Sequence, residues 1–242
     1  MKTVESLLNG YRWTRSFIRY LFGKSIFEFA YKRQTKSYGS KECHWRIIPD
    51  NLKEDSIVYS FGLGEDIRFE SDIARLHNCT VYAFDPTPKS LKFVEKEAKN
   101  LPLIKVYPYA LAADDGIKKF HLPKNQNHVS GSLIENDGTS TDTIEVPCHS
   151  IEFLMRKFGH ERIDLLKMDI EGNEYEVLES LAAHGVLKNI NQICVEFHFR
   201  FDKNLVKRTK HIFRILKDCG FSLVYSAANQ EEFTFFQTKL FD

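Results

Sequence analysis

Carboxylates and one histidine follow two apolar runs of the sequence. Asp169 comes directly after the run Ile163–Met168, and Glu196 and His198 lie at the end of the run that starts at Gln192. Residues two apart on an extended strand share a face, so Glu196 and His198 should point the same way. An imidazole titrates near neutral pH and suits removal of a proton from an acceptor hydroxyl. We therefore predict that His198, oriented by Glu196, is a base beside Asp169.

The same residue types allow simpler interpretations. A single histidine near a strand end is as often a structural residue as a catalytic one. Asp169, Glu196 and His198 together could hold a divalent cation, but their spacing does not demand one, and no metal is predicted. Glu171 and Glu174 stand before a helical pattern, where carboxylates also complement the positive end of a helix.

A glycine turn follows the apolar run Ile57–Phe61. Gly62 and Gly64 permit a sharp turn and a close approach of a ligand to the backbone. Ile67 stands where a dinucleotide fingerprint has its third glycine, and the Gly-x-x-x-x-Gly-Lys phosphate loop is absent. Asp85, 23 residues after Gly62, ends the next apolar run. A carboxylate there can accept both hydroxyls of a ribose, although it could also simply complement a helix start.

An acidic pair, Glu65 and Asp66, comes directly after the glycines. These carboxylates would repel the negative charges of a pyrophosphate at this turn, whereas they would attract a positively charged sulfonium compound. The glycine turn and the strand-end acid together favour an adenosine-containing, positively charged ligand.

Apolar runs alternate with helical patterns from residue 57 onward, which predicts an α/β fold with a mostly parallel sheet and helices on both faces. Phe69, Ile73 and Leu76 carry the first helical pattern. The predicted parallel strands are 57–61, 79–84, 103–107, 163–168 and 192–197. The last two runs, 221–225 and 233–237, lie too close for a helical crossover and predict an antiparallel hairpin, for seven strands in all.

Residues 113–148 interrupt this alternation. Their polar, glycine- and asparagine-containing sequence surrounds two short strand-like runs, 118–122 and 143–147, and predicts an inserted hairpin. The small-residue segment Val129–Ser132 within it is a candidate lid.

The first 44 residues form a predicted extension of different character. Residues 1–41 contain nine Lys or Arg and two Glu, a net charge of +7, while the other 201 residues carry −6. Apolar side chains at Leu7, Tyr11, Ile18 and Leu21 fit a helical stripe, so a basic amphipathic helix is expected before a domain at 45–242. A docked substrate lid, a membrane-surface contact and, less favoured, a nucleic-acid contact all fit this helix.

Composition sets the class of protein. The 242 residues are 43% hydrophobic and 28% charged, which is typical of a globular domain rather than of a disordered or fibrous chain. No apolar run approaches the roughly 20 residues of a membrane span. Five cysteines without a Cys-x-x-Cys spacing argue against a disulfide framework or structural zinc. We expect a cytoplasmic location, with the basic extension available for peripheral contact with a membrane.

Five segments in order carry a family resemblance: Tyr59–Asp66, Ala83–Pro88, Tyr107–Ala112, Leu166–Gly172 and Val195–His198. Together they resemble the FkbM-type S-adenosylmethionine-dependent methyltransferases over residues 45–238. The resemblance implies a Rossmann-like class I methyltransferase fold, S-adenosylmethionine as cofactor, and methyl transfer, usually to oxygen. It implies that Asp169 faces the methionine amine of the cofactor or the acceptor, while the catalytic roles of His198, Glu196 and Asp169 are predicted from the strand ends described above. It assigns to cofactor binding Phe61, Gly62, Gly64, Glu65, Asp85, Pro86, Ala110, Leu111 and Asp169.

One position departs from the pattern, because Ser60 stands where this class often has an acid two residues before the first glycine. An inactive cofactor-binding or membrane-associated protein on the same fold is therefore the main alternative. A nucleic-acid methyltransferase is less favoured, since Asp169–Gly172 replaces the Asn/Asp-Pro-Pro-aromatic segment. Ile67 and the final hairpin disfavour a nicotinamide oxidoreductase. The expected acceptor is a hydroxyl of a sugar, glycan or small metabolite; the oligomeric state cannot be read from these residues.

Overall fold

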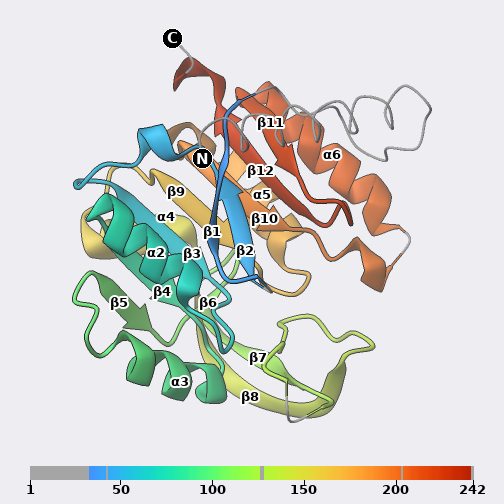
Figure 1. Ribbon diagram of the computed structural model, residues 1–242. Coiled ribbons are helices and arrows are strands. Elements are labelled where there is room, and N and C mark those ends of the chain that lie inside the picture. The colour runs from blue at the N-terminus through green and yellow to red at the C-terminus, as the bar shows by residue number, and fades with distance from the viewer. Residues whose placement is uncertain (1–32, 42, 126–127, 203, 241–242) are drawn as a thin grey trace.

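A seven-stranded sheet forms the centre of the computed structural model, which describes residues 33–41, 43–125, 128–202 and 204–240. Its order is β11-β12-β10-β9-β3-β4-β5 (Figure 1). The strands are β3 (Ile57–Phe61), β4 (Thr80–Phe84), β5 (Ile104–Tyr107), β9 (Leu165–Met168), β10 (Gln192–Glu196), β11 (Phe221–Ser226) and β12 (Glu232–Gln237). The first five are parallel and β12 is antiparallel to both of its neighbours. This is the predicted Rossmann-like class I methyltransferase sheet with its C-terminal antiparallel hairpin.

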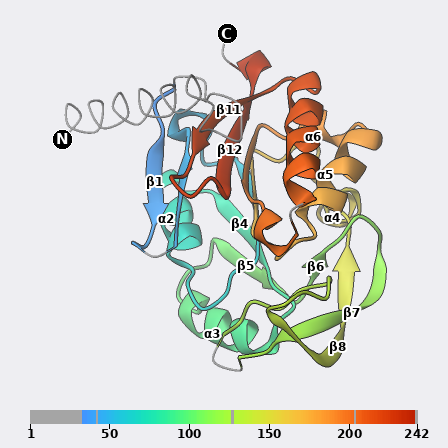
Figure 2. The same ribbon diagram turned by 90° about the vertical axis from the view of Figure 1, so that its right-hand side faces the viewer.

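Helices cover both faces of the sheet (Figure 2). One face packs against α4 (Ile151–Phe158), α5 (Glu174–Ala183) and α6 (Leu205–Asp218). The other packs against α2 (Arg68–His77) and α3 (Pro88–Ala98). The strands are apolar without alternation because both of their faces are covered. The short 3-10 helices are η1 (Pro49–Asn51), η2 (Val186–Asn189), η3 (Phe199–Phe201) and η4 (Thr238–Leu240).

The helix α2 begins where the spacing predicted, but its buried stripe is different. Phe69 and Ile73 are buried, whereas Leu76 is 58% exposed. Glu70 and Ala74 are buried instead. The buried stripe therefore consists of residues 69 and 70 and, one helical turn later, residues 73 and 74. The burial of a glutamate on this stripe has consequences for the site.

A β-hairpin occupies the end of the predicted N-terminal extension. β1 (Lys36–Gly39) pairs with β2 (His44–Ile47) in antiparallel register, so the helix predicted for residues 1–44 is wrong over this part. Tyr38, Trp45 and Ile47 are buried in the core beside α2, and the hairpin belongs to the domain. The basic amphipathic pattern at residues 1–32 lies outside the described residues. Within the described part of the chain, no helix is both long and apolar enough to cross a membrane.

The insertion at 113–148 forms a small separate sheet, as its two strand-like runs predicted. β7 (Gly116–Pro123) and β8 (Thr139–His149) are antiparallel, and β6 (Ala110–Leu111) joins β8 in parallel. Phe120, Val146 and Cys148 form its own buried cluster. The insertion thereby places the segment that follows β7 next to the carboxyl ends of the central strands.

Two buried residues on adjacent strands lie beneath the glycine turn. Ser60 of β3 is paired in register with Lys167 of β9, and its hydroxyl donates to Oε1 of Glu70 at 2.6 Å. The Lys167 ammonium donates to the carbonyls of Phe61, at 3.1 Å, and Gly62. Burial lowers the pKa of Lys167, but the charges of Asp169 and Glu70 outweigh it and hold the group protonated. The serine that departs from the family pattern therefore belongs to a buried charge network.

We expect Lys167→Met to lower the free energy of unfolding by about 3–5 kcal/mol, because it leaves the buried Glu70 carboxylate without its countercharge. Urea unfolding followed by circular dichroism measures the change. Adding Glu70→Gln to the Lys167→Met variant should recover part of the loss. Lys119→Met, at an exposed lysine of β7, is the matched control and should cost less than about 0.5 kcal/mol. Equal losses in Lys167→Met and Lys119→Met would contradict the assignment.

Candidate active site

A cavity of about 250 Å³ lies at the carboxyl ends of β3, β4 and β9, which is where an open α/β sheet binds its ligand. All nine residues predicted to bind the cofactor line it: Phe61, Gly62, Gly64, Glu65, Asp85, Pro86, Ala110, Leu111 and Asp169. Their positions in one cavity agree with the prediction. Their contacts with a cofactor stay predictions.

Glycine is required at the turn for a steric reason. Gly62 has φ +77°, and a Cβ on it would overlap the backbone carbonyl oxygen of Asp169. Gly64 has φ +59°, again in the left-handed region that other residues avoid. The turn between β3 and α2 thus packs directly against the end of β9, with no side chain between them.

The Asp85 carboxylate holds this turn from the cavity side. Its Oδ2 accepts from the backbone N–H groups of Leu63, at 2.9 Å, and Gly64, at 3.2 Å. Its Oδ1 accepts from the Thr87 N–H at 2.8 Å. A carboxylate has about four acceptor positions, and three are taken. Asp85 therefore has room for one ribose hydroxyl rather than the two that the sequence suggested.

The charge of the cavity wall tests whether a sulfonium cofactor fits. Five lining side chains are acidic and none of the described lining residues is basic; the acids are Glu65, Asp66, Asp85, Asp169 and Glu171. Asp66 and Glu65 pair with Arg68 and Lys89, which lie outside the lining. Phe84, Tyr109 and Leu111 supply apolar wall. This lining suits a ligand with an aromatic base and positive charge, and it would repel a pyrophosphate.

The candidate lid lies over the glycine turn. Val129, Ser130 and Gly131 line the cavity, and Val129 approaches within 3.4 Å of where a Cβ on Gly64 would stand. The Ser132 hydroxyl donates to the Glu171 carbonyl at 2.6 Å. The insertion is thereby tied to the turn that follows β9, as a cover over the cavity must be.

The turn from Asp169 to Glu174 carries an unusual backbone conformation. Glu171 has φ +52° although it is not a glycine, and Gly172 has φ +109°. A non-glycine residue in this region costs about 1–2 kcal/mol. Glu174 compensates by accepting from the Gly172 N–H at 2.9 Å. Such strain is typical of functional turns, and here it turns the Glu171 side chain toward the cavity wall.

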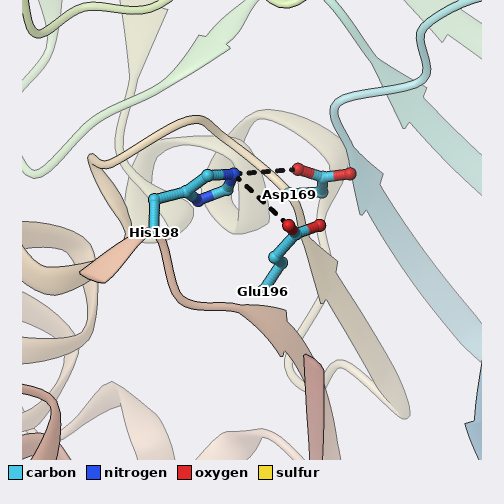
Figure 3. A group of neighbouring side chains, drawn as sticks. All are labelled: Asp169, Glu196 and His198. Atoms are coloured by element: carbon cyan, nitrogen blue, oxygen red, sulfur yellow. Dashed lines mark ion pairs between the residues drawn. The ribbon is translucent and has the colours of Figure 1, made fainter. Parts of the chain in front are cut away.

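His198 is buried at the centre of a carboxylate cluster, one residue beyond Phe197 and at the start of η3. Its Nδ1 lies 3.2 Å from Oε1 of Glu174, which also accepts from the His198 backbone N–H at 2.7 Å. Its Nε2 lies 3.2 Å from Glu171 Oε2. The same nitrogen lies 3.7 Å from Asp169 Oδ1 and 3.7 Å from Glu196 Oε1 (Figure 3). The structure thus brings Asp169, Glu196 and His198 together, and their catalytic roles stay predictions.

The partner that orients the ring is different from the predicted one. Glu174, fully buried at the start of α5, forms the hydrogen bond to Nδ1, whereas Glu196 faces the opposite nitrogen. Glu196 is instead held by Arg200, whose Nη1 lies 3.1 Å from its Oε1. The sequence spacing could not show that Glu174 binds His198. A carboxylate that only complements the helix dipole would stand at the same position, in the first turn of a helix.

Charge decides what the imidazole can do. Burial alone would lower the pKa of His198, but the Glu174 hydrogen bond and the charges of Glu174, Asp169 and Glu171 raise it to about 9. A ring that holds its proton at neutral pH is a poor acceptor for another, so the predicted base role does not suit His198. Burial raises the pKa of Glu171, despite the opposing charge of His198. Burial and the Asp169 charge likewise raise the pKa of Glu196.

A family model described as "Methyltransferase FkbM domain" matches residues 57–223. The chain is 27% identical over 183 residues to the "Probable methyltransferase-like protein 24" of Homo sapiens, covering 70% of this chain and 42% of that protein. It is 22% identical over 191 residues to the "Hexuronic acid methyltransferase AglP" of Haloferax volcanii, covering 77% of this chain and 72% of that one. The chain thus spans less than half the length of the human relative.

Among solved structures, a fibrillarin pre-rRNA processing protein of Methanococcus jannaschii is similar with a TM-score of 0.46 at 13% identity, covering 89% of this chain and 85% of that one. The fold assignment rests on the strand order and directions of the central sheet and not on this similarity.

Glu232, opposite Glu196 in the β10–β12 ladder, gives a pH prediction. Burial and the Glu196 and Asp169 charges raise its pKa to about 7. Its folded-state pKa exceeds the unfolded value, so its contribution to stability is present below about pH 4.5 and is lost as the pH rises through 7.

We expect Glu232→Gln to stabilise the protein more at high pH than at low pH. The free energy of unfolding of the variant minus that of the parent should be about 1–2 kcal/mol larger at pH 8 than at pH 5, after allowance for solvent screening. Chemical unfolding at both pH values, in buffers free of divalent cations, measures this difference. A pH-independent difference would contradict it.

Proposed function

Because this chain belongs to the FkbM methyltransferase family, for which S-adenosylmethionine is the cofactor, we propose that it transfers the methyl group to a hydroxyl oxygen of a sugar, glycan or small metabolite. The carboxylate cluster beside the cofactor cavity carries this proposal. An oxygen acceptor must lose a proton during methyl transfer, and Asp169 and Glu171 line the cavity with oxygen atoms that can take one. The similarity to a hexuronic acid methyltransferase supports a sugar acceptor.

Bound S-adenosylmethionine supplies a methyl group already activated for transfer, so the protein has to position the acceptor and handle its proton. Asp85 and the glycine turn hold the cofactor side of the cavity. Asp169, which lines the cavity, is the proposed group that positions the acceptor oxygen, and His198 and Glu196 support it from the carboxylate cluster behind the cavity wall.

Glu171 is the proposed base. It lines the cavity, only 19% of its side chain is exposed, and its raised pKa brings it closer to the working pH, which favours proton transfer. His198 serves as a fixed positive neighbour of these carboxylates rather than as the proton acceptor. In this proposal Asp169, Glu196 and His198 remain part of the active site, as predicted from the sequence, but the base is Glu171 instead of His198.

The first experiment measures cofactor affinity. Calorimetric titration with S-adenosylhomocysteine should show one site per chain. Asp85→Asn should weaken it about 10-fold or more, because the variant loses charge-assisted bonds that shape the glycine turn. Asp114→Asn, at a side chain that is 87% exposed, is the matched control and should bind like the parent. Unchanged affinity in Asp85→Asn would remove Asp85 from the cofactor site.

The second experiment measures methyl transfer from radiolabelled S-adenosylmethionine to glucuronic acid, to its glycosides and to a pool of polyhydroxylated metabolites. Glu171→Gln should lower kcat about 100-fold while S-adenosylhomocysteine affinity stays within about 3-fold, as expected for loss of a base. Glu135→Gln, on the exposed surface of the insertion, should leave kcat unchanged. Cofactor binding without transfer to any hydroxyl acceptor would instead favour the inactive cofactor-binding alternative.

A further inference from the structure

We propose that Asp169, Glu196 and His198 bind a divalent cation of the Mn²⁺ type next to the cofactor cavity. One ligand atom from each of the three residues lies within 4.8 Å of the others. His198 Nε2 lies 3.7 Å from one oxygen of Asp169 and 3.7 Å from one oxygen of Glu196 (Figure 3). Ligand atoms that each lie about 2.1 Å from one cation are separated by about 3 to 4 Å, so small side-chain adjustments suffice.

The orphaned imidazole nitrogen is the independent observation behind this site. His198 is 1% exposed at its side chain, and its Nε2 has no hydrogen-bond partner among the described residues although three carboxylates surround it. An unsatisfied buried polar atom costs free energy. A cation at Nε2 would satisfy that nitrogen and the carboxylates together, in exchange for any proton that it carries.

The ring is already held as metal-binding histidines are. Glu174 fixes Nδ1 through its own buried carboxylate, which leaves Nε2 to point at the other acids. A carboxylate on the far nitrogen is the common second partner of a ligating histidine, since it sets the tautomer and the ring orientation. The first turn of α5 thus supplies the support and the ends of β9 and β10 supply the ligands.

The charge balance requires positive charge here. Asp169, Glu171, Glu174 and Glu196 are four carboxylates around one ring, which gives up the proton on Nε2 when that nitrogen binds a cation. Lys167 and Arg200 offset only part of the negative charge that then remains, and a divalent cation supplies charge of the opposite sign. A mixed set of two carboxylates and one imidazole favours a first-row transition ion such as Mn²⁺ over Ca²⁺, which prefers oxygen ligands only.

The site also has an entry path and a use. Asp169 lines the cavity and is 29% exposed at its side chain, so a cation can arrive from the acceptor side. Three protein ligands leave coordination positions for water or for oxygens of an acceptor, whose hydroxyl a bound cation would make more acidic. This use rests on the proposed function, whereas the binding of the cation does not.

The test is a calorimetric titration of the chelator-treated, full-length chain with MnCl₂. We expect one saturable site per chain. Glu196→Gln and His198→Gln should each weaken Mn²⁺ at least 10-fold, the range seen when a metal site loses even an outer partner. Glu232→Gln removes a carboxyl group on the neighbouring strand β12 that is not a proposed ligand, and it should change affinity less than about 3-fold.

A second readout separates loss of a ligand from loss of fold. Bound Mn²⁺ should broaden the His198 ring signals in NMR spectra of the parent, and Glu196→Gln should keep the parent's thermal unfolding midpoint within a few degrees. No saturable binding at up to about 1 mM Mn²⁺, or equal weakening by Glu232→Gln and Glu196→Gln, would overturn the proposal. Failure of methyl transfer with saturable Mn²⁺ binding would overturn the proposed function instead.

Discussion

A buried lysine and a buried aspartate fix the glycine turn on which the site depends. Lys167 donates to the carbonyls of Phe61 and Gly62 from below, and Asp85 accepts the N–H groups of Leu63 and Gly64 from above. These backbone groups of the turn are therefore satisfied by side chains rather than by a ligand. The burial of Lys167 is tolerated because the charges of Asp169 and Glu70 stabilise its ammonium group, and this links the glycine-turn side of the cavity to the sheet beneath it.

The other side of the cavity is organised by one histidine. His198 binds the fully buried Glu174 with one nitrogen and faces Asp169, Glu171 and Glu196 with the other. These acids come from the ends of two adjacent strands and from the strained turn between β9 and α5. The charge balance of the cluster depends on that single ring, because it is the group that all four acids share. Arg200 closes the cluster on its outer side by pairing with Glu196 and Glu231.

The fold could be predicted from the sequence because its signals are local. Strand β3 was predicted with its observed ends, and the spacing between the last two strands required an antiparallel hairpin. The β1–β2 hairpin was missed because Tyr38, Trp45 and Ile47 follow a basic stretch whose stripe suggested a helix. Leu76 belongs to the apolar repeat that predicted α2 but is exposed, since two helical stripes one residue apart share Phe69 and Ile73. Which of the two stripes is buried depends on the side chains of the sheet against which the helix packs.

The sequence by itself determined the succession of strands along the chain, the glycine turn and the acids that end β4, β9 and β10, because each depends on residues close together in the chain. Only the tertiary structure decided which charges meet. Glu70 on a helix acts electrostatically on Lys167 of the sheet, Glu174 reaches His198 across 24 residues of chain, and Asp85 uses most of its acceptor positions on backbone N–H groups around it. Electrostatic roles depend on distance and burial across the fold, and residue spacing along a chain specifies neither.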